Sequence, residues 1–178
     1  MDWTLPDIIK ACKNQDKQAQ FALFRIYHER FLGICIRYLY RKEIAEEVLM
    51  DAFMTIFQKI DFYQTDSFEG WMKTIVIHKS IDYYRKHKDD PIITEINHRS
   101  LNQAITKPNH KLHAEELMKY LDQLPLGYRV VFNMFAIEGY QHKEIAEKLG
   151  ITESTSKTQY AKARKKLQDM LKEGGYDV

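Results

Sequence analysis

The sequence predicts an all-α protein of two small helical domains joined by a flexible linker, with a helix-turn-helix in the second domain. Only seven glycines and four prolines occur among its 178 residues, and this low content favours long helices. Apolar residues recur at steps of three and four, the spacing of one helical face. A polar stretch with two prolines interrupts the pattern. We therefore expect helical domains at residues 1–88 and 111–178, with a linker at 89–110.

Four helices are expected in the first domain, at residues 4–13, 16–39, 42–60 and 67–87. Thr4 is a suitable N-cap for the first helix. The second is expected to turn inward the residues Phe21, Phe24, Tyr27, Phe31, Ile34, Cys35 and Leu39. The third carries an apolar stripe made of Ala45, Leu49, Ala52, Phe53, Ile56 and Ile60. The fourth is apolar nearly all round, so we expect neighbours to cover it on both sides.

The second domain ends in a pattern typical of a helix-turn-helix. Helices are expected at 111–123 and 126–138, before Gln141 begins a third helix with Glu144 placed three residues later, a variant of the capping box. Gly150 stands where a left-handed residue must end that helix. Thr152 can then cap the last helix.

The last helix is expected to have one inward and one exposed face. Its inward face carries Ser156, Tyr160, Ala163, Leu167 and Met170, and Ser156 should cost some packing. Its exposed face carries polar donors, as recognition helices do: Ser154, Thr155, Thr158, Lys162 and Lys165.

Charge is unevenly distributed although the formal net charge is only +2. Basic residues gather at 73–88 and 157–172, and acidic residues at 43–51. Basic clusters attract nucleic-acid phosphates, but many charge runs are simply solvated helix faces. The basic clusters therefore indicate nucleic-acid binding only in combination with the helix-turn-helix.

Several functional classes are disfavoured. Two cysteines, Cys12 and Cys35, are too few for a disulfide framework and suggest a reducing compartment. The sequence has no membrane-length apolar run and no secretory leader, so we expect a cytoplasmic protein without membrane insertion. Phosphate-loop, zinc-protease and nucleophile-elbow motifs are absent, so we expect no enzyme activity, cofactor or small-molecule substrate. His110, His113 and Glu116 have metal-like spacing, but we interpret them as surface residues.

The two halves of the chain resemble the extracytoplasmic-function sigma factors, small initiation factors of bacterial RNA polymerase. AEEVLMDAF (45–53) resembles the polymerase-binding helix of region 2, and SFEGWMKTIVIHKSIDYYRK (67–86) resembles the helix that reads and opens the −10 element. LPLGYRVVFNMFAIEGYQHKEIAEKLGITESTSKTQYAKARKKLQ resembles region 4, which reads the −35 element. The resemblance implies core RNA polymerase, promoter DNA and an anti-sigma factor as partners.

The acidic stretch on the third helix supplies the expected polymerase contacts. Glu47, Asp51 and Met54 lie opposite the core stripe, with Met50 beside them, and exposed methionines paired with acids favour a partner surface. The resemblance implies that this partner is the clamp coiled coil of the largest polymerase subunit. The expected contact residues are Glu46, Glu47, Met50, Asp51 and Met54.

The resemblance also implies two sets of DNA contacts. For the −10 element these are Phe62, Tyr63, Lys73, His78, Lys79, Arg85 and Lys86. Phe62 and Tyr63 would hold a flipped base or, alternatively, cap the helix bundle. Base-reading positions of region 4 fall on Lys157, Thr158, Ala161 and Lys162, and phosphate contacts on Arg164, Lys165 and Lys166.

An alternative is a helix-turn-helix regulator that acts without binding core polymerase. Tight, sequence-specific DNA binding by the isolated chain would favour that alternative, because each basic patch of a sigma factor is too small for tight binding alone.

Overall fold

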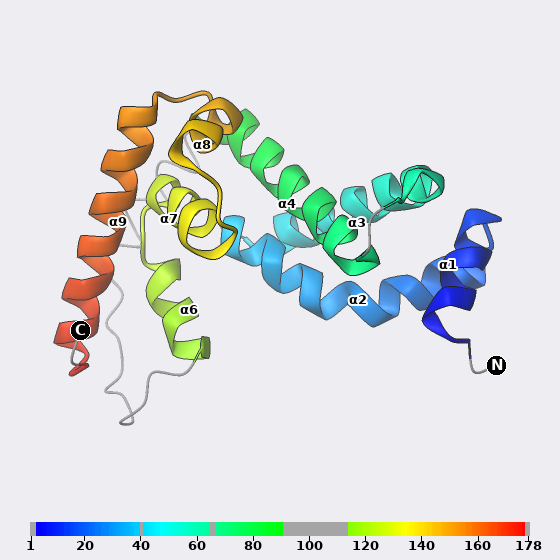
Figure 1. Cartoon of the computed structure of the whole chain (residues 1–178). Helices are drawn as coiled ribbons and strands as arrows, with labels where there is room; N and C mark the ends of the chain where they lie inside the picture. The colour runs from blue at the N-terminus through cyan, green and yellow to red at the C-terminus, as the bar shows by residue number, and fades with distance from the viewer. Residues whose placement is uncertain (1–2, 40, 65–66, 91–113, 177–178) are drawn as a thin grey trace. The chain divides into compact units, whose positions relative to one another are not determined.

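The computed structural model of the chain describes residues 3–39, 41–64, 67–90 and 114–176. These residues form helices and no strand, so the predicted all-α fold is confirmed (Figure 1). The chain divides into two compact units, Met1–Tyr83 and Tyr84–Val178. Nearly all of the expected linker at 89–110, together with His110 and His113, lies outside the described residues. None of the helices described could cross a membrane.

The first unit contains α1 (Leu5–Lys13), α2 (Lys17–Tyr38), α3 (Lys42–Lys59) and most of α4 (Phe68–His87), close to the predicted bounds. Thr4 is the N-cap of α1, as expected. At the start of α2 the carboxylate of Asp16 accepts hydrogen bonds from the backbone N–H groups of Gln18 and Ala19, at 2.8 and 3.0 Å. These caps satisfy donors that have no partner within the helix.

The core of the first unit joins α2 to α3 and α4. The predicted stripe of α3 is confirmed, because all six of its residues are buried. The predicted face of α2 is partly wrong, since Phe21 is 62% exposed and Leu23 is buried in its place. Steps of four from Ala19 place Leu23, Tyr27, Phe31 and Cys35 on one side, and Phe21 lies far from that side. Arg25 instead lies over the exposed Phe21 ring, at 6.0 Å from its centroid.

The expectation that neighbours cover α4 on both sides holds for part of the helix. Its buried residues are Phe68, Met72, Val76, Ile77, Ser80 and Ile81. At about 100° per residue, Phe68 and Ile77 stand on opposite sides of the helix. Trp71 and Ile75 are only half-buried, and Thr74 and His78 are exposed. Burial therefore extends over more than half of the circumference of α4 and leaves one exposed strip, which contains Thr74 and His78.

Both cysteines are buried, and burial raises the pKa of each thiol to about 11. The thiolate is the reactive form, so only about one thiol in a thousand would be ionised at pH 8 even with open access. We expect iodoacetamide to modify native Cys12 and Cys35 very slowly at pH 8, and both rapidly in guanidinium chloride. Mass spectrometry of timed samples measures this. A Cys35→Ser variant isolates Cys12, and rapid native labelling would contradict the burial.

The second unit contains α6 (Ala114–Asp122), α7 (Leu126–Phe132), α8 (His142–Leu149) and α9 (Glu153–Glu173). The helix predicted at 126–138 is α7 continued by a π-helical segment, Asn133–Ile137. One core cluster joins α6 to α9 and contains Tyr120, Leu121, Leu124, Ala163, Leu167 and Leu171. Where α6 gives way to α7, the buried guanidinium of Arg129 donates to the Asp122 carboxylate at 2.8 Å.

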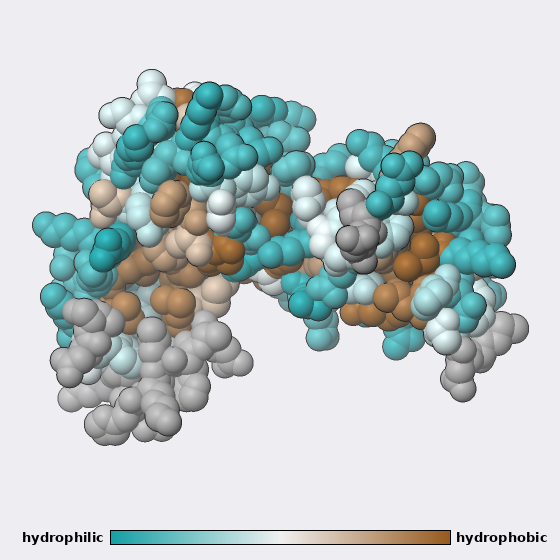
Figure 2. All heavy atoms as spheres, viewed as in Figure 1, coloured by the Kyte–Doolittle hydropathy of each residue, from teal (hydrophilic) through white to brown (hydrophobic). Residues whose placement is uncertain are grey.

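The predicted helix-turn-helix is confirmed in its local details. The backbone N–H of Gln141 donates to the Glu144 carboxylate at 2.7 Å. Gly150 ends α8 with a φ of 64°, a left-handed conformation that favours glycine. Thr152 Oγ1 accepts a hydrogen bond from the backbone N–H of Thr155 at 3.0 Å. On the face drawn in Figure 2, the surface over α8 and the start of α9 is mainly hydrophilic.

Candidate protein and nucleic-acid interfaces

The outward side of α3 combines acids with exposed methionines. Met50 and Met54 are 52% and 56% exposed, and the remaining members, Glu46, Glu47 and Asp51, are also exposed. We call these five residues the acid-methionine face. It lies opposite the buried stripe of the same helix, so the residues expected to bind a partner are brought together on one accessible surface. Flexible thioethers suit such a surface because they adapt to the shape of a partner.

One member of this face also contacts α4. The ammonium of Lys79 lies 2.7 Å from Oδ2 of Asp51. Sequence reasoning placed Asp51 in a protein interface and Lys79 in a DNA interface, and it did not pair them. Both side chains are partly exposed, so water screens the pair and its contribution to stability is at most about 1 kcal/mol.

The aromatic residues between α3 and α4 separate into two environments. Phe62, in a 3-10 turn at Ile60–Phe62, is 76% exposed. Tyr63 is half-buried, and its ring centroid lies 5.0 Å from that of Phe68 and 5.7 Å from that of Trp71. Tyr63 thus packs on the start of α4, as the bundle-cap alternative predicts. Phe62 has an accessible face on which a nucleobase could stack.

The basic residues of α4 differ in accessibility. His78, Arg85 and Lys86 are exposed, whereas Lys73 and Lys79 are half-buried. Lys73 and Lys79 are almost two turns apart, so they lie on different parts of the helix surface. A single small anion could therefore not contact both lysines at once.

The exposed side of α9 carries most of the expected −35 contacts. Its exposed members are Ser154, Lys157, Thr158, Ala161, Lys162, Arg164 and Lys165. Thr155 and Lys166 are half-buried. The Lys157 ammonium lies 2.6 Å from Glu153 one turn earlier, and this ion pair occupies one of its three donors.

A polar contact beneath this surface was not anticipated. Ser156 is fully buried, as predicted, but its Oγ lies 2.9 Å from Nδ1 of His142 on α8. The His142 ring stacks on Phe135 at 4.3 Å, and Phe135 in turn contacts Tyr160 at 4.5 Å. The expected packing cost of Ser156 is therefore offset by a hydrogen bond that ties α8 to α9.

Sequence comparison assigns both units. A family model of sigma-70 region 2 matches residues 23–89, and a model of sigma-70 region 4 matches residues 114–167. Together the two models cover more than half of the chain. The chain belongs to the sigma-70 family. Its two regions follow one another in the order that the sequence resemblance predicted, and that resemblance is confirmed.

Named relatives of this sigma factor are extracytoplasmic-function members. The sigma factor SigM of Bacillus subtilis is 28% identical over 138 residues, which are 76% of this chain and 85% of SigM. SigW of the same species is 26% identical over 186 residues, covering 97% of this chain and all of SigW. One similar solved structure is that of the sigma factor RpoE from Bartonella quintana in complex with the anti-sigma factor NepR. The two sequences are 20% identical, the match covers 85% of this chain and 95% of the RpoE chain, and the TM-score is 0.49.

Among the residues that the structure describes, no three His, Cys, Asp or Glu side chains are grouped so that they could hold a metal ion. The three residues singled out for metal-like spacing fall outside the described part, since the side chain of Glu116 is also not described. The candidate surfaces for protein and nucleic-acid binding are the acid-methionine face, α4 with the turn before it, and the exposed side of α9.

Proposed function

We propose that this sigma factor binds core RNA polymerase and directs promoter recognition and DNA opening at the start of transcription. The observation that carries the proposal is the succession of sigma-70 regions 2 and 4 along one chain. In the proposed organisation, residues 1–88 bind polymerase and the −10 element, 89–110 form the linker, and 111–178 bind the −35 element. Core polymerase and promoter DNA place this activity in the cytoplasm.

Each surface has a specific partner in this proposal. The acid-methionine face binds the clamp coiled coil of the largest polymerase subunit. Phe62 and Tyr63, with His78 and the basic residues of α4, bind the −10 strand, while α9 enters the major groove of the −35 element. An anti-sigma factor is the proposed regulatory partner. Strand opening draws on the exchange of base stacking for protein contacts, so the chain itself needs no cofactor or catalytic residue.

Transcription in vitro tests the function. The full chain and core polymerase are supplied with a library of promoter sequences, and transcripts are sequenced. We expect transcripts that depend on the chain and share two spaced elements. The alternative, a regulator that acts without core polymerase, would be supported by two results. Transcription would not depend on the chain, and the free chain would bind duplex DNA sequence-specifically with nanomolar affinity.

Two lysines on α9 are expected to respond differently to substitution. Lys162→Ala removes an exposed donor aimed at base edges, so it should cost about 1–3 kcal/mol and relax preference at one or two positions of the −35 element. Lys166→Ala removes a phosphate contact, so it should weaken binding to all promoters alike. It should also reduce the slope of log affinity against log salt concentration by about one unit.

Promoter-library profiles measured at several salt concentrations separate these two roles. Lys172→Ala provides the control, because Lys172 is an exposed lysine near the end of the same helix. The assignment fails if Lys166→Ala changes the preferred −35 sequence while Lys162→Ala does not.

A further inference from the structure

Among the described residues, exposed sulfur-containing side chains occur only on the acid-methionine face. Met50 and Met54 are 52% and 56% exposed. The other methionines that the structure describes are buried or half-buried, namely Met72, Met118, Met134 and Met170. Met50 and Met54 are one helical turn apart, so their thioethers lie on the same side of α3. A small oxidant in solution can therefore reach both sulfur atoms.

The two thiols of the chain compete poorly for such an oxidant. Cys12 and Cys35 are buried, and burial raises the pKa of each thiol to about 11. Peroxides react with the thiolate, which is scarce at neutral pH when the pKa is that high. A thioether needs no deprotonation, so we expect a hydroperoxide to oxidise the exposed methionines first.

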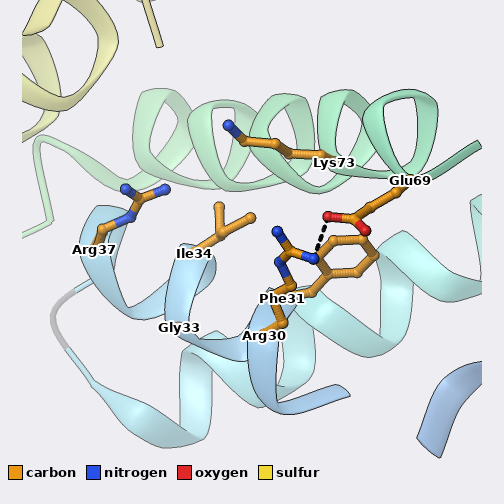
Figure 3. A pocket seen from close by; sticks show the side chains of 7 residues that line it. All are labelled: Arg30, Phe31, Gly33, Ile34, Arg37, Glu69 and Lys73. Atoms are coloured by element: carbon orange, nitrogen blue, oxygen red, sulfur yellow. Dashed lines mark ion pairs between the residues drawn. The ribbon is translucent and has the colours of Figure 1, made fainter. Parts of the chain in front are cut away.

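The pocket between α2 and α4, about 310 Å³ in volume, does not change this order (Figure 3). Arg30 and Glu69 line it, and Nη1 of Arg30 lies 2.5 Å from Oε1 of Glu69. None of its lining residues contains sulfur. An oxidant that enters this pocket therefore meets neither a thioether nor a thiol.

We propose that Met50 and Met54 form a reversible oxidation site, and that their oxidation by a hydroperoxide prevents binding to core polymerase. The proposal rests on the proposed function. The thioether sulfur attacks the terminal oxygen of the hydroperoxide, the O–O bond breaks, and the departing alkoxide takes the proton and leaves as an alcohol. Sulfur is oxidised to the sulfoxide and the peroxide is reduced. Methionine sulfoxide reductases reverse the change, as a dithiol becomes a disulfide and the oxygen leaves as water.

Oxidation replaces two apolar, flexible contacts by polar ones. A sulfoxide oxygen is a hydrogen-bond acceptor, and its burial against an apolar partner surface without a donor is unfavourable. The acids of the same face, Glu46, Glu47 and Asp51, also accept and cannot donate to it. The buried stripe of α3 lies on the opposite side, so we expect the helix to keep its structure. Oxidation therefore acts on the interface, and bound polymerase protects both sulfur atoms.

The test treats the full chain with tert-butyl hydroperoxide, a probe for accessible thioethers. Mass spectrometry of peptides should show sulfoxide first at Met50 and Met54. After the peroxide is removed, surface plasmon resonance with immobilised core polymerase should show affinity at least about tenfold weaker, because polar groups are buried without partners. Circular dichroism should be unchanged. The two reductases MsrA and MsrB, one for each sulfoxide epimer, should together restore the affinity.

Leucine variants locate the effect, with each affinity expressed relative to the same variant before oxidation. Met50→Leu with Met54→Leu removes both thioethers, so this ratio should stay close to one. Met118→Leu with Met170→Leu is the matched control, because it removes two half-buried methionines outside α3 and should lose affinity as the wild type does. A loss that persists in the α3 variant, or unchanged binding of a wild-type chain oxidised at both positions, would overturn the proposal.

Protection by polymerase gives a second measurement that needs no substitution. With about nine-tenths of the chain bound, both sulfoxides should form about tenfold more slowly than in the free chain. Equal rates in the free and bound chain would overturn the oxidation site even though polymerase binding is intact. Failure of the unoxidised chain to bind core polymerase would instead reject the proposed function.

Discussion

Replacing Glu47 and Met54 by lysine is expected to abolish association of the chain with core RNA polymerase. Both side chains are exposed on the acid-methionine face of α3, so the substitutions leave the buried stripe of that helix intact. One change reverses a charge and the other places a charge on an apolar contact, and together they should cost at least about 3 kcal/mol of binding. Surface plasmon resonance with immobilised core polymerase measures the affinity.

The matched control is Glu29→Lys with Ile26→Lys. This pair also replaces one exposed acid and one exposed apolar side chain, but on α2. The control should bind core polymerase nearly as tightly as the wild type. We leave Asp51 unchanged because Lys79 contacts it, and its substitution would alter the proposed DNA surface as well. If both double variants bind core polymerase with equal affinity, α3 is not part of the polymerase interface.

Asp122→Ala is expected to destabilise the unit formed by α6 to α9 by about 2–3 kcal/mol. The guanidinium of Arg129 is buried and donates to Asp122 at 2.8 Å, so loss of the carboxylate removes its counter-charge. Breaking a fully buried pair costs about 3–5 kcal/mol, and the half-exposed Asp122 side chain reduces this value. Urea unfolding followed by circular dichroism gives the free energy of unfolding.

Arg129→Met supplies the informative comparison for that pair. It removes the buried charge together with its need for a partner, while the methionine side chain keeps most of the volume. We therefore expect a smaller loss than in Asp122→Ala. Asp169→Ala, an exposed acid on α9, should change the stability by less than about 0.5 kcal/mol. A larger loss in Arg129→Met than in Asp122→Ala would show that the guanidinium contributes mainly through contacts other than Asp122.

Features confined to one helix or one turn could be predicted from the sequence. The stripe of α3 repeats without a break, so its period also locates the acid-methionine face opposite. Gly150 and Thr152 have backbone and capping requirements that few other residues meet, and both adopt the predicted roles. In these places local chemistry and tertiary packing demand the same arrangement.

Contacts between helices could not be predicted in the same way. The pairs Lys79 with Asp51, Arg30 with Glu69, and Ser156 with His142 each join residues of two different elements. A helical period shows which face of its own element is inward and carries no information about the partner face. Phe21 was misplaced for a related reason. Apolar residues occupy more than one side of α2, so period alone could not choose between them.

The contact between Lys79 and Asp51 should change how the DNA affinity of this protein depends on salt concentration. A lysine that meets a DNA phosphate normally releases a condensed cation, which is why affinity falls with salt. Lys79 must first leave a carboxylate, and that carboxylate then attracts a cation from solution. Uptake of one ion offsets release of the other, so Lys79 should add almost nothing to the salt slope of the free chain. If polymerase covers Asp51, as proposed above, we expect the same phosphate contact to regain its full slope.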